Sequence, residues 1–210
     1  MKNIVQFTSI MVATLLTVSF CMTPSVFAGD HNGLYVGVGA GIDNPTGPNE
    51  DGYSLAPGWT IRGGYQFIDY LALELGYDQG IGRFSSPQNL NGSWSFMELP
   101  YLNVKPIIPL NKTNNIYFLI GGGYVNRVLQ TSNVNPKMTY TANPNIGIDL
   151  GIGYEGYLTS YLSLGAEVIY HYFTYDKINV SGGGTNTTVS LPISSDGSTT
   201  SVNITLLYHY

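Results

Sequence analysis

The chain has 210 residues, the size of one domain or at most two. Charged residues make up only 10% of it, against about 25% in soluble globular domains, whereas glycine (26) and tyrosine (17) are abundant. A formal net charge of −5 excludes the basic face that nucleic-acid binding requires. Beyond the first segment no apolar run approaches the roughly 20 residues of a membrane helix. Because only helices and closed barrels satisfy every backbone polar group in a bilayer, we expect a closed β-barrel.

The first segment has the three parts of a secretory signal. Lys2 makes its start positive, residues 10–18 are mostly apolar, and Ala28 is the small residue that precedes the expected cleavage. We therefore expect residues 1–28 to be removed and residues 29–210 to form one outer-membrane β-barrel domain.

A lipoprotein signal at Cys21 is the alternative for this segment. Phe20, the residue before it, is too bulky for the usual lipidation motif, so we favour the cleaved signal. Cys21 is the only cysteine, and the mature chain then has no disulfide framework and no thiolate metal site. We expect no cofactor and no metal.

The mature chain alternates apolar residues with glycine, polar or charged residues. This period of two is typical of strands that face lipid on one side and a lumen on the other. In the regular segments every charged residue falls on the second face, which is otherwise rich in glycine. The pattern predicts an all-β fold, an eight-stranded antiparallel up-and-down transmembrane β-barrel. The segments are 34–42, 59–67, 71–78, 94–110, 116–124, 146–155, 162–171 and 202–210.

The fourth segment, residues 94–110, is the least regular. Leu102 and Val104 fit lipid-facing positions, but the same parity carried backward would point Glu98 and Pro100 at lipid. A β-bulge near Pro100 would restore the pattern, because proline cannot donate to the ladder.

The connections alternate between long and short. Short turns are predicted at 68–70, 111–115 and 156–160, and long loops at 43–57, 79–93, 130–143 and 176–201. Bacterial barrels have short periplasmic turns and long outer loops, which places both termini in the periplasm.

Aromatic residues gather near the segment ends, as in the two girdles that flank a membrane band. Tyr157 is also predicted near the periplasmic interface. The predicted girdle residues are Trp59, Tyr65, Phe67, Tyr154, Tyr170 and Tyr172.

Three stretches carry a family resemblance. Residues 33–39 (GLYVGVG), 147–168 (GIDLGIGYEGYLTSYLSLGAEV) and 204–210 (ITLLYHY) resemble strands of the OmpA/OmpX-type outer-membrane β-barrel family. The resemblance implies a location in the cell outer membrane of a Gram-negative bacterium and assembly by the barrel-assembly machinery. It also implies that the machinery reads the terminal alternation, Ile204, Leu206, Tyr208 and Tyr210.

The resemblance further implies a lumen filled by a salt-bridged polar network. Leu119 and Gly165 occupy inward positions where the family pattern would tolerate cations. Because this chain has no cation at either position, its lumen is expected to be rich in acids. The inward carboxylates could form a catalytic pair, but pairing with cations is the interpretation we favour. The expected network comprises Arg62, Glu74, Lys105, Asp149, Glu155 and Glu167.

Two motifs suggest other chemistry. Gly151, Gly153 and Gly156 match a dinucleotide-binding pattern, which needs a helix after it, and a second strand is predicted there instead. His171, facing inward near the outer rim with Asp149 opposite, is the best catalytic candidate for a lipid A-modifying enzyme.

We therefore expect a non-enzymatic barrel with a structural or surface-interaction role, which covers membrane integrity, adhesion or partner binding through its outer loops. A narrow cation-preferring pore is the first alternative, and a lipid A-modifying enzyme the second. Expected partners are outer-membrane lipid, lipopolysaccharide and a host or partner protein, but no nucleic acid.

Overall fold

The computed structural model describes residues 32–46, 52–85, 91–132, 136–142 and 145–210. The secretory signal, its cleavage after Ala28 and the lipidation alternative at Cys21 lie outside the described residues. Among the residues that are described, none forms a helix with the length and hydropathy needed to cross a membrane. The strands are β1 (Gly33–Pro45), β2 (Ala56–Ile68), β3 (Leu71–Ser85), β4 (Asn91–Pro109), β5 (Asn114–Thr131), β6 (Thr139–Ala142), β7 (Asn145–Tyr157), β8 (Leu162–Gly182) and β9 (Thr185–His209).

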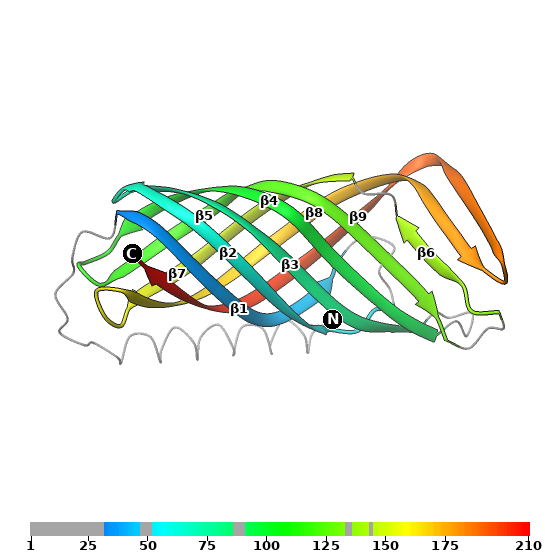
Figure 1. The fold of residues 1–210 in the computed structure, drawn as a ribbon, viewed down its shortest axis with the longest axis horizontal. Helices are drawn as coiled ribbons and strands as arrows, with labels where there is room; N and C mark the ends of the chain where they lie inside the picture. Colours follow the sequence, from blue (N-terminus) through cyan, green and yellow to red (C-terminus); the bar gives the residue numbers. More distant parts are fainter. Residues whose placement is uncertain (1–31, 47–51, 86–90, 133–135, 143–144) are drawn as a thin grey trace.

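Eight of these strands close into a ring. The strands β1, β2, β3, β4, β5, β7, β8 and β9 pair antiparallel in that order, and β9 returns to pair with β1. Figure 1 shows the strongly tilted strands, with β9 beside β1. The predicted eight-stranded antiparallel up-and-down barrel is confirmed. The short β6 is an addition, which pairs with β5 and β8 beyond the point where β7 begins.

The pleat sorts side chains to two faces as the alternation predicts. On β1, Val36 and Val38 are about half exposed on the outer wall. Tyr35, the residue before Val36, points into the barrel and is 1% exposed. The exposed face carries mostly Leu, Val, Ile and aromatic residues, which a bilayer covers, while the buried face carries most of the charged residues.

The fourth strand contains the predicted irregularity. Its register shifts by one residue against both neighbours between Glu98 and Tyr101. Leu99 and Pro100 are consecutive exposed residues, so two residues occupy the space of one in the pleat. The bulge turns Glu98 inward, where it is fully buried. The bulge near Pro100 is therefore confirmed.

The outer connections differ from the prediction. Residues 176–201 were expected to form a polar loop, but β8 and β9 pair continuously from Lys177↔Ser190 to Gly182↔Thr185. Gly183 and Gly184 have φ of +59° and +83°, which suits the two-residue turn of a hairpin. Backbone pairing in an antiparallel ladder does not depend on apolar side chains, so a run of Thr, Asn and Ser can continue a strand. The predicted short turns join β2 to β3, β4 to β5 and β7 to β8.

Tyr157 is a second correction. It was predicted in the aromatic girdle near the periplasmic interface, and it does lie at the short-turn end of β7, but its side chain is 3% exposed inside the barrel, on the same face as Glu155. Its ring packs against His209, with the centroids 5.0 Å apart.

Candidate functional site

The interior nearest the short turns holds one charge cluster. Lys105 Nζ on β4 lies 2.9 Å from Glu155 Oε2 on β7. The other carboxylate oxygen, Oε1, accepts from Ser163 Oγ at 2.6 Å and lies 3.1 Å from His209 Nε2. Lys105 also lies 4.1 Å from the centre of the Tyr117 ring, in cation–π range. This ammonium therefore has both a counter-ion and an aromatic face.

The middle of the lumen is organised by Arg62 on β2. Its two terminal nitrogens meet the two oxygens of Glu167 on β8 at 2.8 and 2.5 Å, which is the bidentate geometry of an arginine–carboxylate pair. Arg62 Nη1 also lies 3.3 Å from Glu74 Oε1 on β3. Tyr35 donates to Glu74, and Tyr117 donates to Glu167. All five side chains are buried, so the cluster ties the opposite walls of the barrel together.

The third cluster surrounds His171 on β8, and we call it the His171 cluster. His171 Nδ1 lies 2.9 Å from Asp149 Oδ1 and 3.1 Å from Glu98 Oε2. On the other side of the ring, Nε2 lies 3.2 Å from Ser201 Oγ and 3.8 Å from an oxygen of Asp78. Ser201 Oγ in turn donates to Asp43 Oδ1 at 2.5 Å. The members are Asp43, Asp78, Glu98, Asp149, His171 and Ser201.

An apolar layer lies beyond the His171 cluster, and we call it the aromatic layer. Phe96 packs against His171 with ring centroids 5.0 Å apart, and against Phe173 at 5.8 Å. The buried members are Ala56, Trp94, Phe96, Val125 and Phe173, with Tyr53, Phe84, Leu129 and Tyr175 packed around them. The layer separates the His171 cluster from the outer end of the barrel.

Asp43 fits inside the barrel only because its neighbours are glycines. A Cβ at Gly80 would overlap Asp43 Oδ2, and one at Gly58 would be 2.5 Å from the same atom. The inward glycines of β2 and β3 therefore make room for a buried carboxylate rather than for an open channel.

His171 lies between Ser201 and Asp149, as the histidine of a Ser-His-Asp catalytic triad does. Two observations speak against nucleophilic catalysis. Ser201 donates its proton to Asp43, which leaves Nε2 as donor rather than as base towards the hydroxyl. Both His171 and Ser201 are at most 1% exposed beneath the aromatic layer, so a substrate has no room beside them.

The structure places all six residues of the predicted lumen network inside the barrel. It joins Arg62 to Glu74 and Glu167, and Lys105 to Glu155, whereas Asp149 belongs to the separate His171 cluster. Sequence reasoning did not assign Asp43 or Ser201, because both fell in predicted loops. Extending the period of two past the loop boundaries would have placed both on the inner face. Gly151 and Gly153 lie within β7, and a strand follows, so the dinucleotide pattern has no helix.

The predicted girdle residues lie on the outer wall. Trp59, Tyr65, Phe67 and Tyr170 are 41–54% exposed, and Tyr154 and Tyr172 are half-buried. Trp59 packs on Tyr77 with centroids 4.9 Å apart. The residues of the terminal alternation also point outward, at 43% for Ile204, 42% for Leu206, 45% for Tyr208 and 73% for Tyr210.

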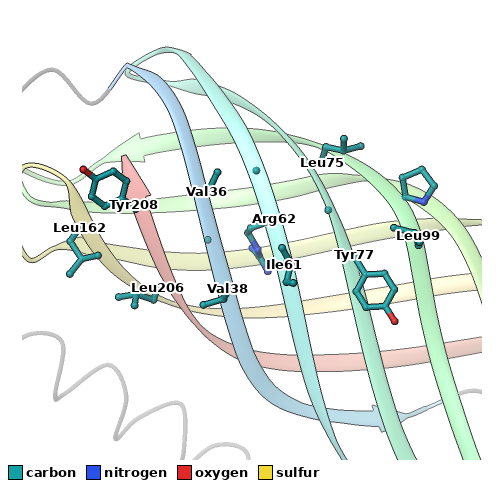
Figure 2. Close-up of a pocket in the computed structure, with 14 residues that line it drawn as sticks. Val36, Val38, Ile61, Arg62, Leu75, Tyr77, Leu99, Leu162, Leu206 and Tyr208 are labelled. Atoms are coloured by element: carbon teal, nitrogen blue, oxygen red, sulfur yellow. The ribbon is translucent and has the colours of Figure 1, made fainter. Parts of the chain in front are cut away.

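An open apolar hollow of about 650 Å³ lies on the same wall. Figure 2 shows its lining, which comes from strands on both sides of β1, including Val36, Ile61, Leu75 and Leu206. Gly63 lies among these residues, and the nearest atom to a Cβ placed on it would be 3.7 Å away. Its lining is almost entirely apolar and lies on the outer wall, so the hollow is not a pore entrance.

Comparison with known proteins identifies the family of this chain and solved structures with a similar fold. The model of the outer membrane protein beta-barrel domain family matches residues 12–209. Among solved structures, Neisserial surface protein A aligns with a TM-score of 0.61 at 11% identity, covering 84% of this chain and 97% of that one. OprG from Pseudomonas aeruginosa aligns with a TM-score of 0.56 at 12% identity, covering 88% and 99%.

Ail, the attachment invasion locus protein of Yersinia pestis, aligns with a TM-score of 0.52 at 14% identity, covering 85% and 99%. These identities show a shared fold. No curated protein sequence matches the chain significantly. The family match over nearly the whole chain, together with the closed ring and its lipid-facing wall, shows that this chain is a bacterial outer-membrane protein and belongs to the outer membrane protein beta-barrel domain family.

Proposed function

We propose that this barrel is a non-enzymatic surface-interaction protein whose binding element is its extended outer hairpin. The observation that carries the proposal is the length of β8 and β9. β8 continues for nine residues beyond Phe173, the last residue that pairs with β7, to Gly182. At roughly 3.3 Å per residue the extension measures about 30 Å along the strand. Figure 1 shows this hairpin projecting past the end of the barrel.

The hairpin is a preformed polar surface. Residues 183–190 are all exposed, and they are mainly Thr, Asn and Ser. β6 pairs with β8 from Thr139↔Ser181 to Ala142↔Ile178, so the hairpin is supported by a third strand. Because its backbone is already ordered, a partner that binds it loses little conformational entropy.

The free edge of β9 indicates the class of partner. In the described part of the chain, residues 185–190 pair with β8 only, since the pairing of β9 with β1 ends at Pro45↔Thr199. An unpaired strand edge accepts an extended peptide by β-augmentation. We therefore infer a protein partner, such as a host-surface protein, that contributes an extended segment.

The filled lumen supports this assignment over the two alternatives. The three charge clusters and the aromatic layer occupy the interior from the short turns to the outer end, which opposes a pore. The burial of His171 opposes an enzyme. The solved structure of Ail with the heparin analogue sucrose octasulfate is evidence that another barrel of this fold binds a ligand.

Three further roles belong to the same proposal. Residues 1–28 direct secretion, and the terminal alternation ending at Tyr210 is read by the barrel-assembly machinery. The girdles and the apolar wall hold the barrel among lipid and lipopolysaccharide, which contributes to membrane integrity.

A shortened hairpin tests the proposal. Residues 178–189 are replaced by Asn-Gly, which joins Lys177 to Ser190, two residues that already face each other in the ladder. Asn-Gly favours the turn that such a link needs. The control replaces only Gly183 and Gly184 with Asn-Gly and keeps the length. Cells that lack the native protein express each variant, and their adhesion to cultured epithelial cells and immobilised matrix proteins is measured.

We expect the shortened variant to adhere no better than cells without the protein, and the length-matched control to adhere like wild type. Heat-modifiable gel migration shows that each barrel is folded. Equal adhesion by the shortened variant and the wild type would refute a binding role for the hairpin.

A further inference from the structure

The His171 cluster contains more negative charge than its cation balances. Asp43, Asp78, Glu98 and Asp149 are four carboxyl groups, each at most 2% exposed. His171 lies within ion-pair distance of each of the last three. Arg62 and Lys105, in contrast, are engaged with other acids. Buried carboxylates are costly without compensating positive charge, so the cluster needs a further cation or protons.

The hydrogen-bond geometry of the cluster is also incomplete. His171 Nδ1 faces both Asp149 Oδ1 and Glu98 Oε2, although a ring nitrogen carries one proton at most. Three further carboxylate oxygens are buried without any hydrogen-bond partner: Asp43 Oδ2, Glu98 Oε1 and Asp149 Oδ2. Native interiors leave few such atoms, and an ion is one of the groups that satisfies them.

The geometry points to a divalent transition-metal site of the Zn²⁺ or Mn²⁺ class formed by Glu98, Asp149 and His171, and we propose that the barrel binds one such ion in its lumen. The ligand atoms of these three residues all lie within 4.8 Å of one another. The separations of 2.9 and 3.1 Å at Nδ1 resemble the distance of about 3.0–3.4 Å between neighbouring ligands whose bonds to one ion are about 2.1 Å. Imidazole with carboxylates suits borderline divalent ions.

The surroundings have the form of an outer ligand shell. A metal-bound imidazole donates its second N–H to a fixed acceptor, which orients the ring. Here Nε2 faces Ser201 Oγ, which donates onward to Asp43. Asp78, on the same side, adds negative charge that offsets the charge of the ion. The aromatic layer then separates the site from water at the outer end, which slows release of the ion.

Three strands contribute the ligands, so the ion would also be a structural tie. Glu98 comes from the bulged part of β4, Asp149 from β7 and His171 from β8. The bulge at Leu99 and Pro100 is what turns Glu98 into the lumen. The bulge therefore has a role in forming the site as well as in strand pairing.

The test measures metal in the untagged full chain, extracted from outer membranes in detergent. Bound Zn²⁺ and Mn²⁺ are quantified by elemental mass spectrometry, and affinity is obtained by titration after chelator treatment. Because the aromatic layer limits access, each metal is supplied both during refolding and after it. The variants are Glu98→Gln and Asp149→Asn, which preserve shape. Asp176→Asn, an exposed acid on β8, is the control.

We expect about one ion per chain in the wild type and in Asp176→Asn, and an affinity at least tenfold lower in the two cluster variants. Heat-modifiable migration identifies any variant that does not fold, and the wild-type stoichiometry decides the question without variants. Absence of bound Zn²⁺ and Mn²⁺ under both regimes would overturn the proposal and assign the balancing charge to shared protons. Equal affinity in folded Glu98→Gln and the control would overturn it as well.

Discussion

Replacing Arg62 with methionine should strongly destabilise the barrel while leaving its shape unchanged. The substitution removes three ion-pair contacts, two to Glu167 and one to Glu74, and leaves both carboxylates in a fully buried position. Removing one partner of a buried pair costs about 3–5 kcal/mol. Each acid retains a tyrosine donor, Tyr35 or Tyr117, so we expect this range rather than twice it.

Urea unfolding of the barrel in detergent measures the effect, with heat-modifiable migration as the readout. With a slope of about 2 kcal/mol per molar urea, the expected loss lowers the midpoint by about 1.5–2.5 M. Arg83→Met, at an exposed position on β3, is the matched control and should change stability by less than about 0.5 kcal/mol.

A triple variant separates charge from packing. Arg62→Met combined with Glu74→Gln and Glu167→Gln removes the whole charged cluster, and such replacement is often neutral or stabilising. We expect it to recover most of the stability lost in Arg62→Met. A loss below about 1 kcal/mol in Arg62→Met, or a triple variant no more stable than the single one, would refute the view that the buried acids require this cation.

Three further outcomes follow from the filled interior. In a planar bilayer the barrel should show no steady conductance, and a cation-selective current altered by Glu74→Gln would instead establish a pore. Ser201 should resist labelling by a fluorophosphonate probe, since it is buried and donates to a carboxylate; a labelled Ser201, or lipid A changed by its substitution, would show an enzyme. Gly80→Ala should cost about 1–3 kcal/mol by forcing a Cβ into Asp43, whereas Gly63→Ala on the lipid face should be nearly neutral, and chemical unfolding of both tests the difference.

The sequence predicts which residues face inward better than it predicts which of them meet. A period of two assigns a face to each position, so Lys105 and Glu155 were placed in the lumen from alternation alone. Their contact depends on the stagger of the strands around the ring, because β5 lies between the strands that carry them. That stagger is set by the closure of the whole barrel, which no single segment encodes.

The boundaries of the strands were also predicted poorly from the sequence. A composition rich in Thr, Ser, Asn and Gly predicts loops. For this reason Asp43 and Ser201 were assigned to loops and not to the inner face of a strand. In a closed barrel the ladder supplies backbone hydrogen bonds to any sequence that stays in register, so the strands extend past the apolar band. The same effect turned a predicted loop into the β8–β9 hairpin.

Closure of the lumen also determines where the chain tolerates change. Each charge in the interior contacts a residue on another strand, as Arg62 on β2 contacts Glu167 on β8, so one substitution leaves a buried partner unsatisfied. Residues 183–190 differ, because they are exposed and their ordering comes from backbone pairing. Side chains there can be exchanged at little cost to folding. A partner-specific surface is therefore compatible with this barrel at the outer hairpin, whereas a new pore or active site would require rebuilding several interdependent charges at once.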